Sequence, residues 1–106
     1  MFRPLEVDVQ GLLPDADALV VGWVESPDLI CGELELATVR SLTLDASARW
    51  EAGEEARRLR LPQAESGEGL VIAYSERGGE VLQLGCVAVR YEDAERPELT
   101  LVLSTP

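Results

Sequence analysis

The sequence predicts a mainly β protein, a single domain over residues 1–106 that folds as a small antiparallel barrel or sandwich of roughly seven to eight strands built from hairpins. Two observations support this prediction. Apolar and polar residues alternate with period two along most of the chain, as expected for strands with one face in water. Turn residues interrupt the alternation at short intervals, and an apolar fraction of 46% is sufficient for one core.

Three candidate strands occupy the first part of the chain, at residues 5–10, 18–25 and 33–36. The second is apolar at both parities, which is typical of a central strand that is covered on both faces. The first and third alternate apolar with acidic residues, so each would have an acidic outer face. The outward carboxylates on these two strands are Glu6, Asp8, Glu33 and Glu35.

Residues 46–60 allow two interpretations. Their alternation favours strands, whereas their Ala, Glu and Arg content and the absence of β-branched residues favour a helix. A helix would place Trp50 on its charged side and Gly53 in its middle. We therefore expect a hairpin that turns at Gly53 and pairs Asp45 with Arg60, and an α+β fold with one helix in 46–60 is the alternative.

The clearest hairpin spans residues 70–91. Gly78-Gly79 interrupts its alternation and can supply the positive φ that a two-residue loop requires. This loop would place Ile72 opposite Gly85. Gly85 is then expected to be a β-bulge or a position where Ile72 lies over bare backbone. A closing strand is predicted at residues 98–104.

The charge composition restricts the possible partners. The chain has 20 Asp and Glu against nine Arg, with no Lys, His or Asn, and a net charge of −11. The missing Lys and Asn fit a high-GC genome, bacterial or phage, but codon usage does not explain the excess of acid. Because such a surface repels phosphates and anionic lipids, we expect no direct contact with nucleic acid or a membrane. A basic protein is the expected partner.

The residue types also argue against catalysis. Without His, neither Cys31 nor Cys86 has the usual activating base, and no Ser triad can form. Both cysteines are expected to be small buried apolar side chains rather than a disulfide framework. The acidic pair Glu54-Glu55 lacks the spacing of a calcium loop. We therefore predict no enzyme activity, no cofactor and no metal.

The expected function is that of an acidic, non-enzymatic binding protein in the cytoplasm, since no apolar leader is evident. It would inhibit or neutralise a basic partner, as an immunity protein, antitoxin or phage-encoded inhibitor does, by presenting carboxylates where phosphates would lie. The predicted contact residues are Glu6, Asp8, Glu33 and Glu35. The alternative is a structural or assembly subunit, such as a virion decoration or shell protein, that forms homo-oligomers through the edge strand 98–104 and its outward Val102.

Overall fold

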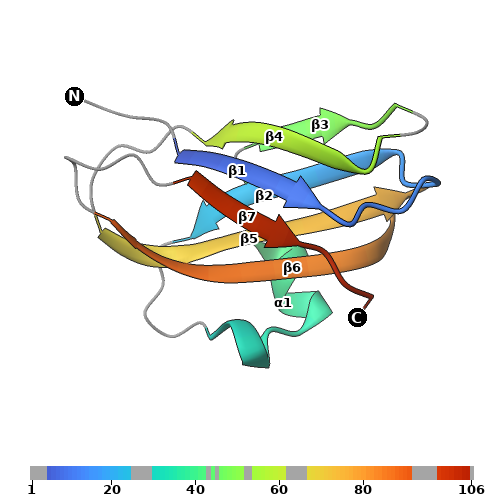
Figure 1. The fold of residues 1–106 in the computed structure, drawn as a ribbon. Helices are drawn as coiled ribbons and strands as arrows, with labels where there is room; N and C mark the ends of the chain where they lie inside the picture. The colour runs from blue at the N-terminus through green and yellow to red at the C-terminus, as the bar shows by residue number, and fades with distance from the viewer. Residues whose placement is uncertain are drawn as a thin grey trace.

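The computed structural model describes residues 5–24, 30–42, 44, 46–51, 54–61, 67–91 and 98–105. The predicted mainly β fold is confirmed, as a sandwich of seven strands in two sheets whose orders are β4-β1-β7 and β3-β2-β5-β6 (Figure 1). The elements are β1 (Leu5–Gln10), β2 (Ala18–Val24), the 3-10 turn η1 (Cys31–Glu33), α1 (Leu36–Ser41), β3 (Ala46–Arg49), β4 (Ala56–Leu61), β5 (Gly67–Arg77), β6 (Glu80–Tyr91) and β7 (Glu98–Val102).

Alternation along the strands divides the buried residues into two groups. On β5, Val71 and Ala73 enter an inner core between the two sheets, while Leu70 and Ile72 point to the opposite face of the four-stranded sheet. That opposite face is covered by η1, α1 and Leu44, which together with it form a separate apolar cluster. The central strands are therefore apolar at both parities because both faces are buried, as predicted for residues 18–25.

The two sheets meet along one side only. The backbone of Leu84 on β6 bridges Ser104, just beyond β7, with N–H···O distances of 2.9 and 3.1 Å. On the other side, β3 pairs with β2 and β4 pairs with β1, and no ladder joins β3 to β4 among the described residues. The architecture is therefore an open sandwich and not a closed barrel.

Residues 46–60 contain strands and no helix in their described part, but the predicted hairpin is wrong. Arg49 on β3 faces Ala18, whereas Arg60 on β4 faces Glu6 in the other sheet. The chain crosses between the sheets after Trp50, whose side chain is buried in the inner core. Burial of this large ring outweighs the local preference for a tight turn, so Arg60 pairs with Glu6 instead of Asp45, which lies outside the described residues.

The hairpin of residues 70–91 is confirmed, with φ of 58° at Gly78 and 86° at Gly79. Its register differs from the prediction because a bulge lies between Ser75 and Glu76 and shifts the pairing by one residue. Ile72 therefore faces Cys86, and Ala73 faces Gly85. Gly85 is neither the bulge nor a platform for Ile72: side chains from the β7 segment, Leu101 and Leu103, pack over it.

The strand predicted at residues 33–36 is also wrong, since this segment forms η1 followed by α1. Its apolar residues cover the outer face of β5, where the fully buried Val39 packs against Ile72, so burial outweighs the period-two pattern.

The cysteines are not free thiols. A disulfide joins Cys31 in η1 to Cys86 on β6, with the two Cα atoms 5.6 Å apart.

Gly22 on β2 allows the covering segment to approach the sheet. A Cβ at this position would lie 2.7 Å from the Cβ of Leu44 and 2.8 Å from its Cα, so Gly22→Ala forces backbone to move. We expect Gly22→Ala to lower the free energy of unfolding by about 1 to 3 kcal/mol in denaturant titration. Gly32→Ala is the matched control, since open space surrounds Gly32, and its effect should stay within about 0.5 kcal/mol. Equal effects of the two variants would contradict this packing.

Candidate functional site

Three connections gather at one end of the sandwich: the β1–β2 loop (residues 11–17), the β3–β4 connection (residues 50–55, described at 50–51 and 54–55) and the β5–β6 turn at Gly78-Gly79 (Figure 1). We call this the loop end. Loops placed on a rigid sheet scaffold commonly carry binding residues, because their side chains are exposed while their backbone is held in position.

The β1–β2 loop joins the other two connections. Its Leu12 N–H donates to the Glu55 carbonyl across 3.2 Å, and its Asp17 N–H donates to the Glu76 carbonyl across 2.9 Å. The Asp17 carbonyl accepts the Trp50 N–H at 3.3 Å. The three connections are therefore held together by backbone hydrogen bonds, independently of the charges that they carry.

A buried amide fixes the start of this loop. Gln83 on β6 is 4% exposed, and its Nε2 donates to the Gly11 carbonyl across 2.7 Å. Its Oε1 accepts the Leu13 N–H and the hydroxyl of the fully buried Ser75, each at 3.2 Å. Since both ends of the amide are satisfied, Gln83 can be buried without an unpaired polar atom.

The loop acids near the β5–β6 turn are used inside the protein. The Arg77 guanidinium forms an ion pair with Asp15 at 2.6 Å, and the Asp17 Oδ2 accepts the Gly78 N–H at 2.9 Å. On the other side of the turn, the Arg40 Nη2 of α1 donates to the Gly79 carbonyl at 3.1 Å. Asp15 and Asp17 therefore hold the turn in place.

Carboxylates outnumber arginines at the loop end. Glu54 forms an ion pair with Arg57 at 3.4 Å, and the Trp50 Nε1 donates to the Glu54 carbonyl at 2.6 Å. Four further carboxylates at the loop end have no arginine partner within the described part of the chain. These unpaired carboxylates are Glu51, Glu55, Glu76 and Glu80.

One of the unpaired carboxylates, Glu76, influences the partly buried phenol of Tyr74. Burial raises the pKa of Tyr74, and the Glu76 carboxylate raises this pKa further, whereas the Arg40 guanidinium lowers it. The phenol therefore stays neutral at physiological pH, and the negative charge of this region comes from its carboxylates.

A surface hollow of about 510 Å³ lies between the β1–β2 loop and the start of β4. It has an apolar side formed by Leu12, Pro14 and Ala56 and an acidic side formed by Glu54 and Glu55. Within the described ranges, no group of three or more His, Cys, Asp or Glu side chains is arranged to hold a metal ion. The carboxylates on the acidic side can accept hydrogen bonds from a basic group and form ion pairs with it.

The four carboxylates predicted as contact residues are not brought together. Glu6 and Asp8 lie on the outer face of the three-stranded sheet, opposite Arg60 and Arg58 in the ladder. The Glu6 side chain is only 13% exposed and lies 3.3 Å from the Arg60 Nε and 4.0 Å from the Arg58 Nη1. The Asp8 carboxylate accepts a hydrogen bond from Gln10.

Glu33 and Glu35 lie on a different side of the molecule. Glu33 ends η1 and Glu35 precedes α1, in the segment that covers the four-stranded sheet. The acidic plate expected from strand alternation therefore does not form from these four residues. The sequence marks Glu54 and Glu55 as neighbouring carboxylates, but their place at the loop end depends on pairings between distant segments.

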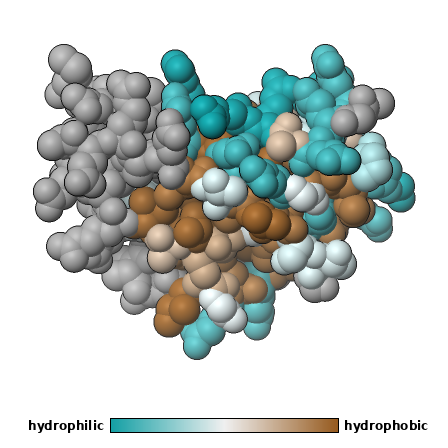
Figure 2. Space-filling model, in the orientation of Figure 1, coloured by the Kyte–Doolittle hydropathy of each residue, from teal (hydrophilic) through white to brown (hydrophobic). Residues whose placement is uncertain are grey.

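Figure 2 shows how polar and apolar residues are distributed on one face. Hydrophilic residues gather along the upper and right-hand margins, whereas apolar residues gather in the centre, over β6 and β7. Val102 on β7 is the most exposed large apolar side chain of the described residues, at 63%.

No helix in the described segments is long and apolar enough to cross a membrane.

Comparison with protein-family models, curated proteins and solved structures finds no match to this chain. The surface of the sandwich is therefore the basis on which a function can be inferred.

Proposed function

We propose that this protein is a non-enzymatic binding protein that neutralises a basic protein partner, and that it contacts this partner through the loop end. The observation that supports the proposal is the surplus of carboxylates on three connections that are tied together by hydrogen bonds. The inhibitor classes that fit are an immunity protein, an antitoxin and a phage-encoded inhibitor.

The distribution of ion pairs supports this choice of surface. Arg58 and Arg60 are both directed to Glu6, so the outer face of β1 and β4 is largely neutralised. At the loop end, Arg57 and Arg77 each engage one carboxylate, and several others stay free to pair with a partner. Since Arg57, Arg58, Arg60 and Arg77 are engaged within the protein, they are less able to neutralise the remaining carboxylates, whose negative charge is then presented to cationic groups.

The rigidity of the loop end also favours binding. The Asp17 backbone and side chain together make three hydrogen bonds, to Glu76, Trp50 and Gly78, so the loop is ordered before a partner arrives. A pre-ordered surface loses less conformational entropy on association. Its negative field would mainly raise the association rate and the specificity for a basic surface.

The cytoplasmic location expected from the sequence stays a prediction, as does the absence of contacts with nucleic acid. The Cys31–Cys86 disulfide weighs against the cytoplasm, because disulfides persist mainly in oxidising compartments. A bacterial periplasm or an extracellular space is compatible with the proposed role, since the protein could meet and neutralise a basic partner there.

The proposal can be tested by removing free carboxylates without changing the fold. The immobilised wild-type protein is used to capture a basic partner from a lysate of the source organism at low salt, and the identified partner is then purified for titration. The variant Glu51→Gln/Glu55→Gln/Glu80→Gln removes exposed carboxylates that have no arginine partner in the described structure. We expect it to weaken binding by about tenfold or more, and wild-type binding to weaken steeply between low and moderate salt.

The matched control removes the same charge elsewhere, through Asp8→Asn/Glu33→Gln/Glu35→Gln. Its affinity should stay within about twofold of the wild-type value, because these side chains lie away from the loop end. Equal weakening by both variants, or binding that does not depend on salt, would contradict the proposal.

A second candidate function is that of an assembly subunit. It is favoured by the exposed Val102 on β7, an edge strand that pairs only with β1 through its ladder in the described structure, and by the apolar centre of Figure 2. An edge strand with an exposed apolar side chain can pair with a second copy of the chain.

Light scattering on the purified protein distinguishes the two candidates. A monomer at concentrations of about 100 μM favours the inhibitor, and a closed symmetric oligomer favours assembly. If an oligomer forms through β7, Val102→Glu should dissociate it. Thr100→Val, which alters the neighbouring outward position on the same strand without adding charge, should leave it intact. An oligomer that persists in Val102→Glu would exclude this edge as the contact.

A further inference from the structure

The segment that covers the outer face of the four-stranded sheet is separable from the sandwich. We call it the cover: residues 30–42 and 44, which include η1 and α1. Its fully buried Val39 and half-buried Leu34, Leu42 and Leu44 form an apolar cluster with the outer face of the sheet, where Leu70 and Ile72 are the buried members. None of its residues belongs to the inner core between the sheets. The sandwich therefore does not depend on the cover for its main core.

The cover has little stability of its own. η1 contains no buried residue, and α1 has six residues of which only Val39 is buried. Neither element has a side-chain hydrogen bond that caps its N-terminus. A helix of this length is not stable in water without external contacts, so the cover is held by what attaches it to the sheet.

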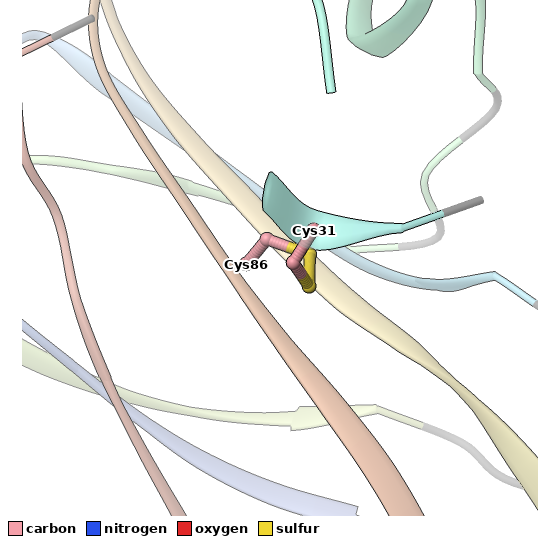
Figure 3. Close-up of a disulfide and its surroundings, with 2 residues drawn as sticks. All are labelled: Cys31 and Cys86. Carbon is pink, nitrogen blue, oxygen red and sulfur yellow. A yellow bond between two sulfur atoms is a disulfide. The ribbon is translucent and has the colours of Figure 1, made fainter. Parts of the chain in front are cut away.

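Two attachments accompany the apolar contacts. One is the hydrogen bond from Arg40 to the Gly79 carbonyl, which is exposed to solvent. The other is the disulfide between Cys31 in η1 and Cys86 on β6, shown in Figure 3 where η1 lies against the strand. Apart from the polypeptide backbone, the disulfide is the covalent link between the cover and the sheet in the described part of the chain, and it closes a separation of 55 residues.

The disulfide is partly buried at the margin of the apolar cluster and not sealed within a core. Neither Cys31 nor Cys86 is fully buried, and β6 is the edge strand of its sheet. A thiolate must approach one sulfur along the S–S axis, and access of this kind controls the rate of exchange. A disulfide located only in a sealed core would not be open to such an attack.

We propose that Cys31–Cys86 is a redox-sensitive bond whose reduction by a dithiol releases the cover and uncovers an apolar face of the sheet while the sandwich stays folded. One thiolate of the dithiol attacks a sulfur of the disulfide, the S–S bond breaks, and a mixed disulfide forms. The second thiol of the reductant resolves it and leaves the reductant as its own disulfide. Two electrons and two protons pass to the protein, which ends with two thiols.

The uncovered surface would be apolar, since Leu70 and Ile72 are buried in the cluster that the cover forms with this face of the sheet. A surface of this kind is an interaction site or an aggregation site for as long as the bond stays reduced. The loop end would keep its geometry, because apart from Arg40 its attachments come from the sandwich itself. This inference is therefore independent of the proposed function.

Hydrogen exchange on the wild-type protein with and without dithiothreitol tests the proposal. The reporters are the helical amides of Val39 and Leu42, which donate to the Glu35 and Val39 carbonyls. We expect them to exchange at least about tenfold faster after reduction, while ladder amides at the Val21–Ala73 pair keep their protection. A hydrophobic dye such as ANS should also bind only the reduced protein.

The double variant Cys31→Ala/Cys86→Ala is the control, since dithiothreitol should not change its exchange pattern. Reoxidation of the wild-type protein should restore the original protection. Equal protection of the helical amides in both redox states would overturn the proposal, because the cover would then be held without the bond. Loss of protection throughout the sandwich on reduction would also overturn it, because the cover would not be separable.

Discussion

The buried side chain of Gln83 is the interaction on which the arrangement of the loop end depends. Its amide connects β6 to both Gly11 and Leu13 and so positions the β1–β2 loop. Backbone hydrogen bonds then join this loop to the other two connections. β1 and β2 belong to different sheets, so fixing the loop between them also fixes how the sheets meet at this end. A buried amide is stable when both of its polar atoms have hydrogen-bond partners, as those of Gln83 do.

The same arrangement determines which charges are free. Because β4 pairs with β1, Arg58 and Arg60 lie beside Glu6 and neutralise the face that the strand pattern marks as acidic. Because the chain crosses between sheets after Trp50, Glu51, Glu54 and Glu55 are carried to the loop end. The position of the acidic surface is therefore set by the strand topology and not by the number of carboxylates in the chain.

Local alternation and backbone φ preferences are sufficient to predict the mainly β fold, the 70–91 hairpin and its Gly78-Gly79 turn. Three features could not be predicted in this way. The partner of β4 depends on the burial of Trp50, the covering segment depends on an apolar sheet face that needs burial, and the disulfide depends on that segment reaching β6. For the same reason the sequence places Glu33 and Glu35 on a strand, although their neighbours pack as a short helix. The loop-end surface requires long-range pairings that no single segment encodes.

The most direct test of this account is the free energy of unfolding of Gln83→Met, measured by denaturant titration. Methionine keeps the shape of the side chain but leaves the Gly11 carbonyl, the Leu13 N–H and the Ser75 hydroxyl without their partner. We expect Gln83→Met to lose about 2 to 4 kcal/mol of stability, since each buried unsatisfied group is costly. Gln10→Met, at an exposed position, should change stability by no more than about 0.5 kcal/mol. A Gln83→Met protein as stable as the Gln10→Met protein would contradict the central role of this amide.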